Sequence, residues 1–195
     1  MVRARPQVSR EPLGRARSDM LFPKVLRPTS TEEFRLSESE AVSVPKVTPQ
    51  FQPWRGPPLN NTYGGKAVLE FGGEPLFAEL VILRHFESCG WRGVWIDTFR
   101  KRTLAGLDLS AQLPAEQSAL LNRITAEAGS SGGCFDVFVW RHGAVAFAEA
   151  KHSGRDRVRA TQVRWVAAAL AIGIPLESLL VVEWSLRDER GLTSH

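Results

Sequence analysis

The chain has few cysteines and no long apolar run. Only two cysteines, Cys89 and Cys134, occur among its 195 residues, and they lack the spacing of metal ligands. They are therefore predicted to be reduced thiols of an intracellular protein. No stretch approaches the roughly eighteen consecutive apolar residues of a membrane span, and no apolar segment follows the N-terminal arginines. We expect a cytoplasmic protein with no membrane partner and no secretory leader.

The first sixty residues differ in composition from the rest. They are rich in proline, serine and arginine and show no sustained period of 2 or 3.6. They hold ten Lys or Arg against six Asp or Glu, which leaves fifteen of each, from totals of 25 and 21, for residues 61–195. A largely disordered basic segment is predicted over residues 1–60, before a domain at 61–190 and a tail at 191–195. The segment either attracts phosphates or is a solvated leader without a partner.

Apolar periodicity and turn residues predict an α/β domain of about 120 residues with a mixed sheet flanked by helices. An amphipathic helix is expected to open at Glu74-Pro75 and to end at Gly90. A polar insertion with its own helix separates the first and second core strands. The other expected elements are strands at 67–71, 91–97 and 179–184, a hairpin at 135–151, and helices at 114–127 and 156–172.

The predicted hairpin carries acids on both of its strands. A two-residue turn at His142-Gly143 suits glycine, which reaches positive φ with little strain, and it pairs Arg141 with Ala144. In this register Asp136 lies opposite Glu149, with their Cβ atoms about 4.5 to 5.5 Å apart. Like charges so placed are destabilising. The two carboxylates therefore need a cation between them or a shared proton.

The two faces of the second hairpin strand have different chemistry. Side chains alternate along a strand, so Val145, Phe147, Glu149 and Lys151 share one face and four alanines share the other. An all-alanine face allows a helix to approach closely. The opposite face is apolar near the turn and charged at its far end. Ionisable groups at the edge of an apolar surface are costly unless they are paired or bind a metal, so they indicate a site.

The spacing of these residues resembles the PD-(D/E)XK nuclease superfamily, with the VRR-NUC-like branch as the nearest likeness. Asp136 matches the acid of the second core strand, and Glu149-Ala150-Lys151 matches the Glu-x-Lys of the third. Gln162 matches a glutamine of the following helix. Ala78-Glu79 is similar to the first-helix glutamate of Holliday-junction-resolvase-like members. Phe135 departs from the pattern, since it stands in place of the proline that gives the superfamily its name.

The resemblance implies a restriction-endonuclease-like core with the element order αβββαβ and a Mg²⁺- or Mn²⁺-dependent endonuclease that hydrolyses DNA. Asp136, Glu149 and the backbone carbonyl of Ala150 would hold the metal, and Lys151 would assist the attacking water or stabilise the phosphate. Glu79 would reach the metal through a water or bind a second ion. Gln162 would orient the nucleophile or contact the phosphate. Action as a homodimer is a further expectation, and no organic cofactor is expected.

Other interpretations of the same residues remain open. Four arginines, Arg155, Arg157, Arg159 and Arg164, form either a phosphate-contact patch or solubilising charge. Asp136 and Glu149 are alternatively strand-end acids in solvent with Lys151 as an ion-pair partner. Glu79 is alternatively a solvated residue, with Glu74 or Glu87 in its role. The competing function is a catalytically inactive nuclease-fold module that binds DNA or a partner protein. The sequence does not distinguish DNA from RNA.

Overall fold

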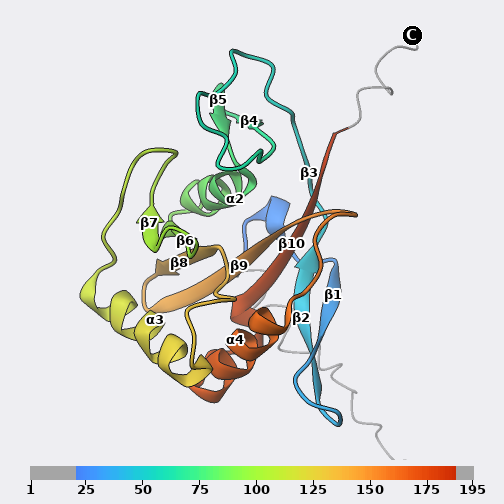
Figure 1. Cartoon of the computed structure of the whole chain (residues 1–195), viewed down its shortest axis with the longest axis vertical. Helices are drawn as coiled ribbons and strands as arrows, with labels where there is room; N and C mark the ends of the chain where they lie inside the picture. The colour runs from blue at the N-terminus through green and yellow to red at the C-terminus, as the bar shows by residue number, and fades with distance from the viewer. Residues whose placement is uncertain (1–20, 188–195) are drawn as a thin grey trace, which may run out of the picture.

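A computed structural model describes residues 21–187, which form an α/β protein with a mixed eight-stranded sheet and three α-helices (Figure 1). A separate hairpin, β4–β5, lies beside the sheet. The elements are η1 (Lys24–Leu26), β1 (Ser30–Arg35), β2 (Ala41–Val47), β3 (Gln50–Phe51), β4 (Leu69–Phe71), β5 (Glu74–Leu76), α2 (Ala78–Glu87), β6 (Arg92–Asp97), β7 (Arg102–Leu104), α3 (Ala115–Ala128), β8 (Val137–Arg141), β9 (Ala144–His152), α4 (Ala160–Ala171), η2 (Leu176–Ser178) and β10 (Leu179–Leu186).

The sheet is covered on both faces. Its strand order is β1-β2-β10-β9-β8-β6-β7, with β3 also paired to β10. Strand β8 is antiparallel to β6 and β9, whereas β9 and β10 are parallel and are joined through α4. Helix α2 covers one face, and α3 and α4 lie together on the other (Figure 1). The two resulting cores meet at the central strands β8, β9 and β10.

The β8–β9 hairpin has the predicted turn. His142 and Gly143 both have positive φ, 48° and 78°, as a two-residue turn of this kind requires. Arg141 pairs with Ala144, which confirms the predicted register. The ladder ends at Val137 and Ala148, so Asp136 lies one residue beyond it rather than within it. The Asp136 carbonyl accepts instead from the Ile96 amide at 2.7 Å, which ties the acid to β6.

The two faces of β9 are used as their chemistry predicts. Ala146 and Ala148 are fully buried in the core that contains the apolar side of α2. On the other face Phe147 stacks on Phe138, with ring centroids 4.4 Å apart, and meets the edge of Trp165 from α4. Small side chains thus admit α2 closely, and aromatic side chains fill the space under α4.

The prediction of disorder over residues 1–60 is wrong for residues 21–60. Strands β1 and β2 extend the main sheet, with β2 parallel to β10 and Val181 paired with Lys46. Phe34, Val44 and Val47 are buried there. This order comes from pairing with a strand far along the chain, which local proline content does not reveal. Residues 1–20 and the tail at 191–195 lie outside the described residues.

Other boundaries also differ from those predicted. Glu74-Pro75 belongs to β5, which pairs with β4 across Gly72-Gly73, so α2 begins only at Ala78. Helix α4 begins at Ala160 rather than near 156. The Asp156 carboxylate accepts from the His152 amide at 2.8 Å, which holds residues 153–159 as a loop. Helix α3 agrees with its prediction within one residue, whereas β7 was not predicted.

Gly133 lies where the chain approaches β8, and we predict that the fold requires a glycine at this position. Its φ is +87°, and an added Cβ would lie 2.2 Å from the carbonyl atoms of Thr161 in α4. We expect Gly133→Ala to lower the free energy of unfolding by about 2 kcal/mol or more, since strain and a backbone clash combine. Denaturant titration measures this. Gly132→Ala is the control, since its nearest contact would be the Ser130 hydroxyl at 3.3 Å. Equal stability of both variants would contradict the prediction.

Candidate functional site

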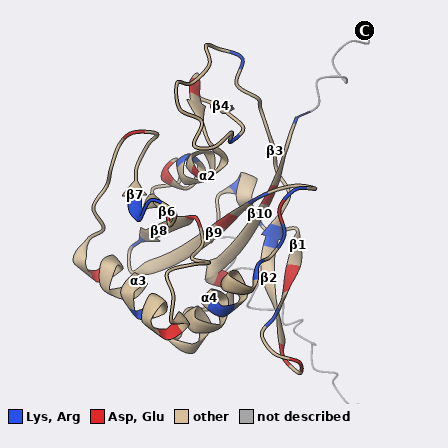
Figure 2. Ribbon diagram, viewed as in Figure 1, with Lys and Arg blue, Asp and Glu red and all other residues tan. Residues whose placement is uncertain are grey.

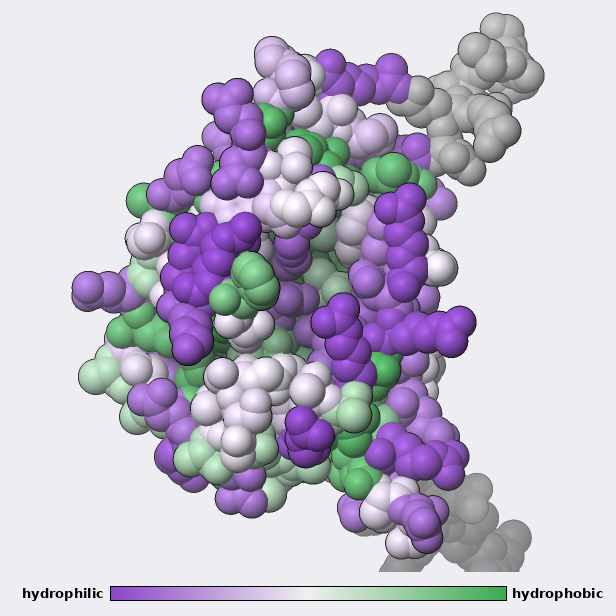
Figure 3. Space-filling model, viewed as in Figure 1, coloured by the Kyte–Doolittle hydropathy of each residue, from purple (hydrophilic) through white to green (hydrophobic). Residues whose placement is uncertain are grey.

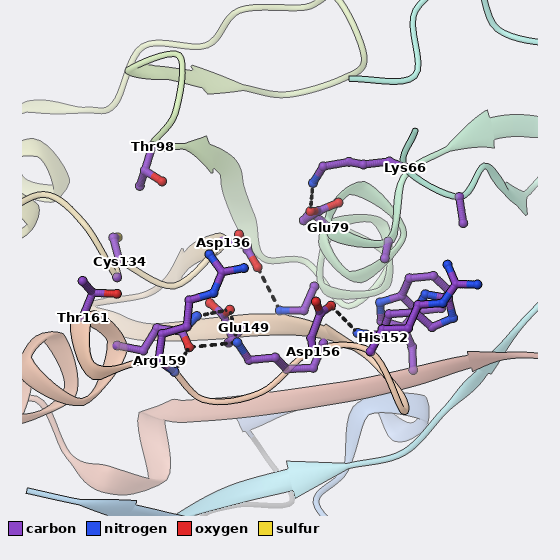
Figure 4. Close-up of a pocket in the computed structure, with 18 of the residues that line it drawn as sticks. Lys66, Glu79, Thr98, Cys134, Asp136, Glu149, His152, Asp156, Arg159 and Thr161 are labelled. Carbon is purple, nitrogen blue, oxygen red and sulfur yellow. Dashed lines mark hydrogen bonds and ion pairs between the residues drawn. The ribbon is translucent and has the colours of Figure 1, made fainter. Parts of the chain in front are cut away.

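A polar pocket of about 420 Å³ opens between the first turn of α2 and the beginning of α4 (Figure 4). Figure 3 shows the face of the molecule hollowed near its centre, with hydrophilic residues around the rim. All of the predicted catalytic residues line this pocket, together with the Ala150 backbone: Glu79, Asp136, Glu149, Lys151 and Gln162. The structure therefore brings together side chains from four separate elements of the chain.

The secondary structure explains how these side chains converge. Glu149 and Lys151 are two residues apart on β9 and so share a face. Glu79 lies in the first turn of α2, where the helix dipole favours a negative charge. Gln162 is the third residue of α4, and its Oε1 accepts from the Arg159 amide at 3.0 Å, which caps the start of the helix. The end of the hairpin thus faces the N-terminal ends of two helices.

Asp136 and Glu149 form an electrostatically strained pair. Burial raises the pKa of Asp136 well above its usual range, and repulsion from Glu149 and Glu79 adds to this. One stabilising contact opposes the shift, because the Ala150 amide donates to Asp136 Oδ2 at 3.0 Å. The alternative that these are strand-end acids facing solvent is wrong for Glu149, which is only 4% exposed, whereas Asp136 is half-buried and lines the pocket. Burial and the neighbouring negative charges together oppose ionisation of Asp136.

The two oxygens of Glu149 differ in their surroundings. Oε1 accepts from Gln162 Nε2 and lies 3.1 Å from Lys151 Nζ. Oε2 is buried and has no hydrogen-bond partner among the described residues. Burial raises the pKa of Glu149 to about 7 despite the attraction of Lys151. Burying a carboxylate oxygen without a hydrogen-bond donor lowers the stability of the folded protein. A cation or a proton bound at Oε2 would therefore be stabilising.

Lys151 is held by three acceptors. Its Nζ donates to Gln162 Oε1 at 2.8 Å and to the Arg157 carbonyl at 3.1 Å, and it pairs with Glu149. An ammonium group has three donors, so this arrangement satisfies all of them. The ion pair expected in the alternative interpretation is therefore present. For Lys151 to contact a water or a phosphate, it must exchange one of these partners.

The donors of this pocket fit a hard divalent cation. Mg²⁺ is commonly held by one or two carboxylates together with waters and phosphate oxygens. Glu149 Oε2 and the Asp136 carboxylate would supply the two charges, and Ala150 also lines the pocket. Residues 21–187 contain no cluster of three or more His, Cys, Asp or Glu arranged as metal ligands. Two carboxylates are fewer than a closed structural site has, so a metal held by them would also need waters.

Lys66 is a site residue that sequence reasoning missed. It precedes β4, and its Nζ pairs with Glu79 Oε1 on the α2 side of the pocket (Figure 4). It also lies over the Trp95 ring, 4.9 Å from the centroid, and it lowers the raised pKa of Asp136. Lys66 follows Gly64-Gly65 in a loop, so no local motif marks it. Two lysines therefore flank the carboxylates, Lys151 on the α4 side and Lys66 on the α2 side.

The structure separates the candidates for the first-helix glutamate. Glu79 is 7% exposed and lines the pocket. Glu74 is exposed on β5, and Glu87 pairs with Arg84 at 2.6 Å, so neither takes the role. The interpretation of Glu79 as a solvated residue is wrong. Its burial follows from its position in the first turn of α2, directly above the central strands.

The four predicted phosphate-contacting arginines divide into two groups. Arg155 and Arg159 line the pocket. Arg164 does not, because it lies two residues beyond Gln162 and so on the exposed outer side of α4. Arg157 lines a different cavity beside Lys46, and its carbonyl, not its guanidinium, meets Lys151. The patch is thus confined to the β9–α4 loop and the beginning of α4.

Comparisons with known proteins found no similar family model, no similar curated protein and no similar solved structure. None of the helices within residues 21–187 is long and apolar enough to cross a membrane.

The raised pKa of Glu149 predicts a pH-dependent stability. Its pKa rises from 4.5 in the unfolded chain to about 7 in the folded protein, so the folded state binds the proton more tightly. Its contribution to the free energy of unfolding is therefore greatest below pH 4.5 and is lost as the pH rises to about 7. In EDTA, we expect wild type to lose on the order of 3 kcal/mol relative to Glu149→Gln across this window. Parallel stability curves for the two proteins would contradict this.

Metal binding is predicted to stabilise the folded protein. At about one hundred times its Kd, Mg²⁺ or Mn²⁺ should add about 2.7 kcal/mol, or roughly 5 to 10 °C in Tm. We expect this shift in wild type and its loss in Asp136→Asn, which keeps an acceptor for the Ala150 amide. Glu33→Gln, an exposed carboxylate on β1, is the control. An equal shift in wild type and Asp136→Asn would place the ion elsewhere.

Proposed function

We propose that the protein is a metal-dependent nuclease that hydrolyses phosphodiester bonds in DNA, with a PD-(D/E)XK-like site. The observation that carries this proposal is the convergence of Asp136, Glu149 and Lys151 from one hairpin in a polar pocket, with Glu149 Oε2 buried and lacking a donor among the described residues. Carboxylates beside a lysine suit phosphoryl chemistry, which requires a metal site, an activated water and positive charge near the phosphate.

The order of elements supports a restriction-endonuclease-like core. Helix α2, strands β6, β8 and β9, helix α4 and strand β10 follow one another as αβββαβ, with α3 inserted between β6 and β8. Their strands are neighbours in the order β10-β9-β8-β6. Strands β1, β2, β3 and β7 add to the edges of this core. Phe135, in the place of the expected proline, is fully buried and stacks on Trp165 at 5.0 Å.

Each side chain has a definite role in this proposal. Asp136, Glu149 and the Ala150 carbonyl would hold Mg²⁺ or Mn²⁺, which when bound lowers the pKa of water and offsets charge on the phosphate. Lys151 orients the attacking water or contacts the phosphate after releasing one of its three acceptors. Gln162 holds Glu149 and Lys151 in place, since it bonds to both. Lys66 keeps Glu79 paired and places a second positive charge near Asp136.

The distribution of charge supports a nucleic acid as substrate. Figure 2 shows basic residues in the segment between β6 and β7 and in the loop between β9 and α4. Both segments contribute to the pocket lining, the first through Thr98 and the second through Arg155 and Arg159. The first carries Arg100, Lys101 and Arg102 at its end, and the second carries Arg155, Arg157 and Arg159. Lysine and arginine on both sides of a groove attract phosphates without regard to sequence. Action as a homodimer remains an expectation from the resemblance alone.

A second candidate function is a catalytically inactive nuclease-fold module that binds DNA or a partner protein. One observation favours it, namely that all three donors of Lys151 are already satisfied by protein acceptors. In such a module the cluster would serve to hold α4 against β9. The two functions differ in whether phosphodiester bonds are cleaved.

Cleavage of plasmid and branched DNA with Mg²⁺ or Mn²⁺ tests the proposal. We expect Asp136→Asn and Lys151→Ala to lower the cleavage rate at least about a hundredfold, the range for loss of a group that acts on a proton or its charge. Lys24→Ala, an exposed lysine in η1, should retain wild-type activity. Circular dichroism verifies that each variant is folded.

The outcomes separate the candidates. Equal cleavage by wild type and both site variants would overturn the assignment of the site. If no protein cleaves DNA but each binds it with an affinity that falls steeply with salt, the non-catalytic module is correct.

A further inference from the structure

The β6–β7 loop, residues 98–101, presents an exposed aromatic side chain beside the pocket. Phe99 is 88% exposed, more than any other large hydrophobic residue in the described part of the chain. The others with high exposure are aliphatic: Val25, Leu109 and Leu186. A phenylalanine in solvent contributes little to folding. Its ring is therefore free to contact a ligand.

The loop is held in this conformation by Asp97 at the end of β6. The Asp97 carboxylate accepts from the Arg100 amide at 3.1 Å and pairs with the Arg100 guanidinium at 3.3 Å. It is also 3.5 Å from Arg102 Nε. The Arg100 guanidinium then lies over the Tyr63 ring, 4.4 Å from its centroid. These contacts fix the residues on either side of Phe99 while its ring remains in solvent.

Phe99 lines a second cavity that adjoins the candidate active site. This cavity has a volume of about 430 Å³, and its walls include Tyr63, Trp95, Phe99 and Arg100. It shares Lys66, Thr98 and Asp136 with the first pocket. A chain lying in both would pass directly from the carboxylates to a space lined by aromatic rings and an arginine.

We propose that Phe99 and this second cavity bind an unpaired nucleobase next to the cleaved phosphodiester bond. This inference rests on the proposed nuclease function and names its substrate class. The substrate is a single strand, or DNA with single-stranded nucleotides at a branch, flap or end. Aromatic side chains stack on any base, so the contact selects unpaired structure rather than sequence.

The chemistry of the cavity favours a nucleotide over an apolar partner. Arg100 and Lys101 follow the exposed ring in the sequence, and Lys66 lines both this cavity and the pocket that holds the carboxylates. A base next to a phosphate requires this combination of a π surface and nearby positive charge. A base inside a duplex is already stacked on both faces and offers no free surface to Phe99. Continuous duplex therefore cannot use the contact.

Equilibrium binding tests the contact independently of cleavage. The anisotropy of a fluorescein-labelled single strand would be measured in Ca²⁺ over a range of salt concentrations. We expect Phe99→Ala to weaken binding at least about fivefold with no change in the salt slope, since stacking releases no counterions. Phe99→Trp should bind as tightly as wild type. Leu109→Ala, which removes an exposed apolar side chain 63% accessible to solvent, is the matched control.

Cleavage of matched substrates then tests the substrate class. One strand would be placed in a continuous duplex or in a duplex with a single-stranded flap. Wild type should cleave the flap faster than the duplex, and Phe99→Ala should lower the cleavage rate about fivefold or more on the flap only.

The outcomes distinguish the base site from the nuclease function. Unchanged binding and cleavage by Phe99→Ala, with Lys151→Ala inactive, would overturn the base site but would support the nuclease function. If neither wild type nor any variant cleaves DNA, but Phe99→Ala binds single strands more weakly than wild type, the proposed nuclease function is wrong and the nucleobase site is supported. Equal binding by wild type and Phe99→Ala overturns the base site in every case, including one in which Phe99 contacts a protein.

Discussion

The desolvation of three carboxylates in one pocket is the constraint on which the site depends. Asp136, Glu149 and Glu79 lie close together, so Glu149 and Glu79 oppose ionisation of Asp136, and Glu79 opposes ionisation of Glu149. Lys66 on one side and Lys151 on the other offset this negative charge. Gln162 bonds to both Glu149 and Lys151 and so holds them together. One Glu149 oxygen is still without a donor among the described residues. This burial lowers the stability of the folded protein, and such a cost is typical of a site that binds a ligand.

Local chemistry made the central hairpin predictable. A His-Gly turn fixes the register, and strict alternation then decides which side chains share a face, so Glu149 and Lys151 were placed correctly. The alanine face of β9 likewise indicated a closely packed helix, and Ala146 and Ala148 share a core with α2. Gln162 was found because its spacing from Lys151 matches a pattern. Each of these conclusions depends on residues within one short segment.

The features that were missed depend on contacts between distant segments. Strands β1 and β2 gain their stability from β10, and Lys66 gains its role only because its loop crosses above α2. The start of α4 was misplaced because Asp156 caps the end of β9 and does not open the helix. Phe135 was counted against the resemblance, yet its stacking on Trp165 joins β8 to α4. At that position a large ring fills space that a proline would leave empty.

Gln162 connects the chemistry of the pocket to the backbone of α4. Its Oε1 accepts both from Lys151 Nζ and from the Arg159 amide, so one atom serves the ammonium and the helix cap. A ligand that draws Lys151 toward itself leaves this oxygen to the amide alone and tightens the cap. The same glutamine oxygen therefore belongs both to the charged cluster of the pocket and to the start of α4, where Arg159 also lines the pocket.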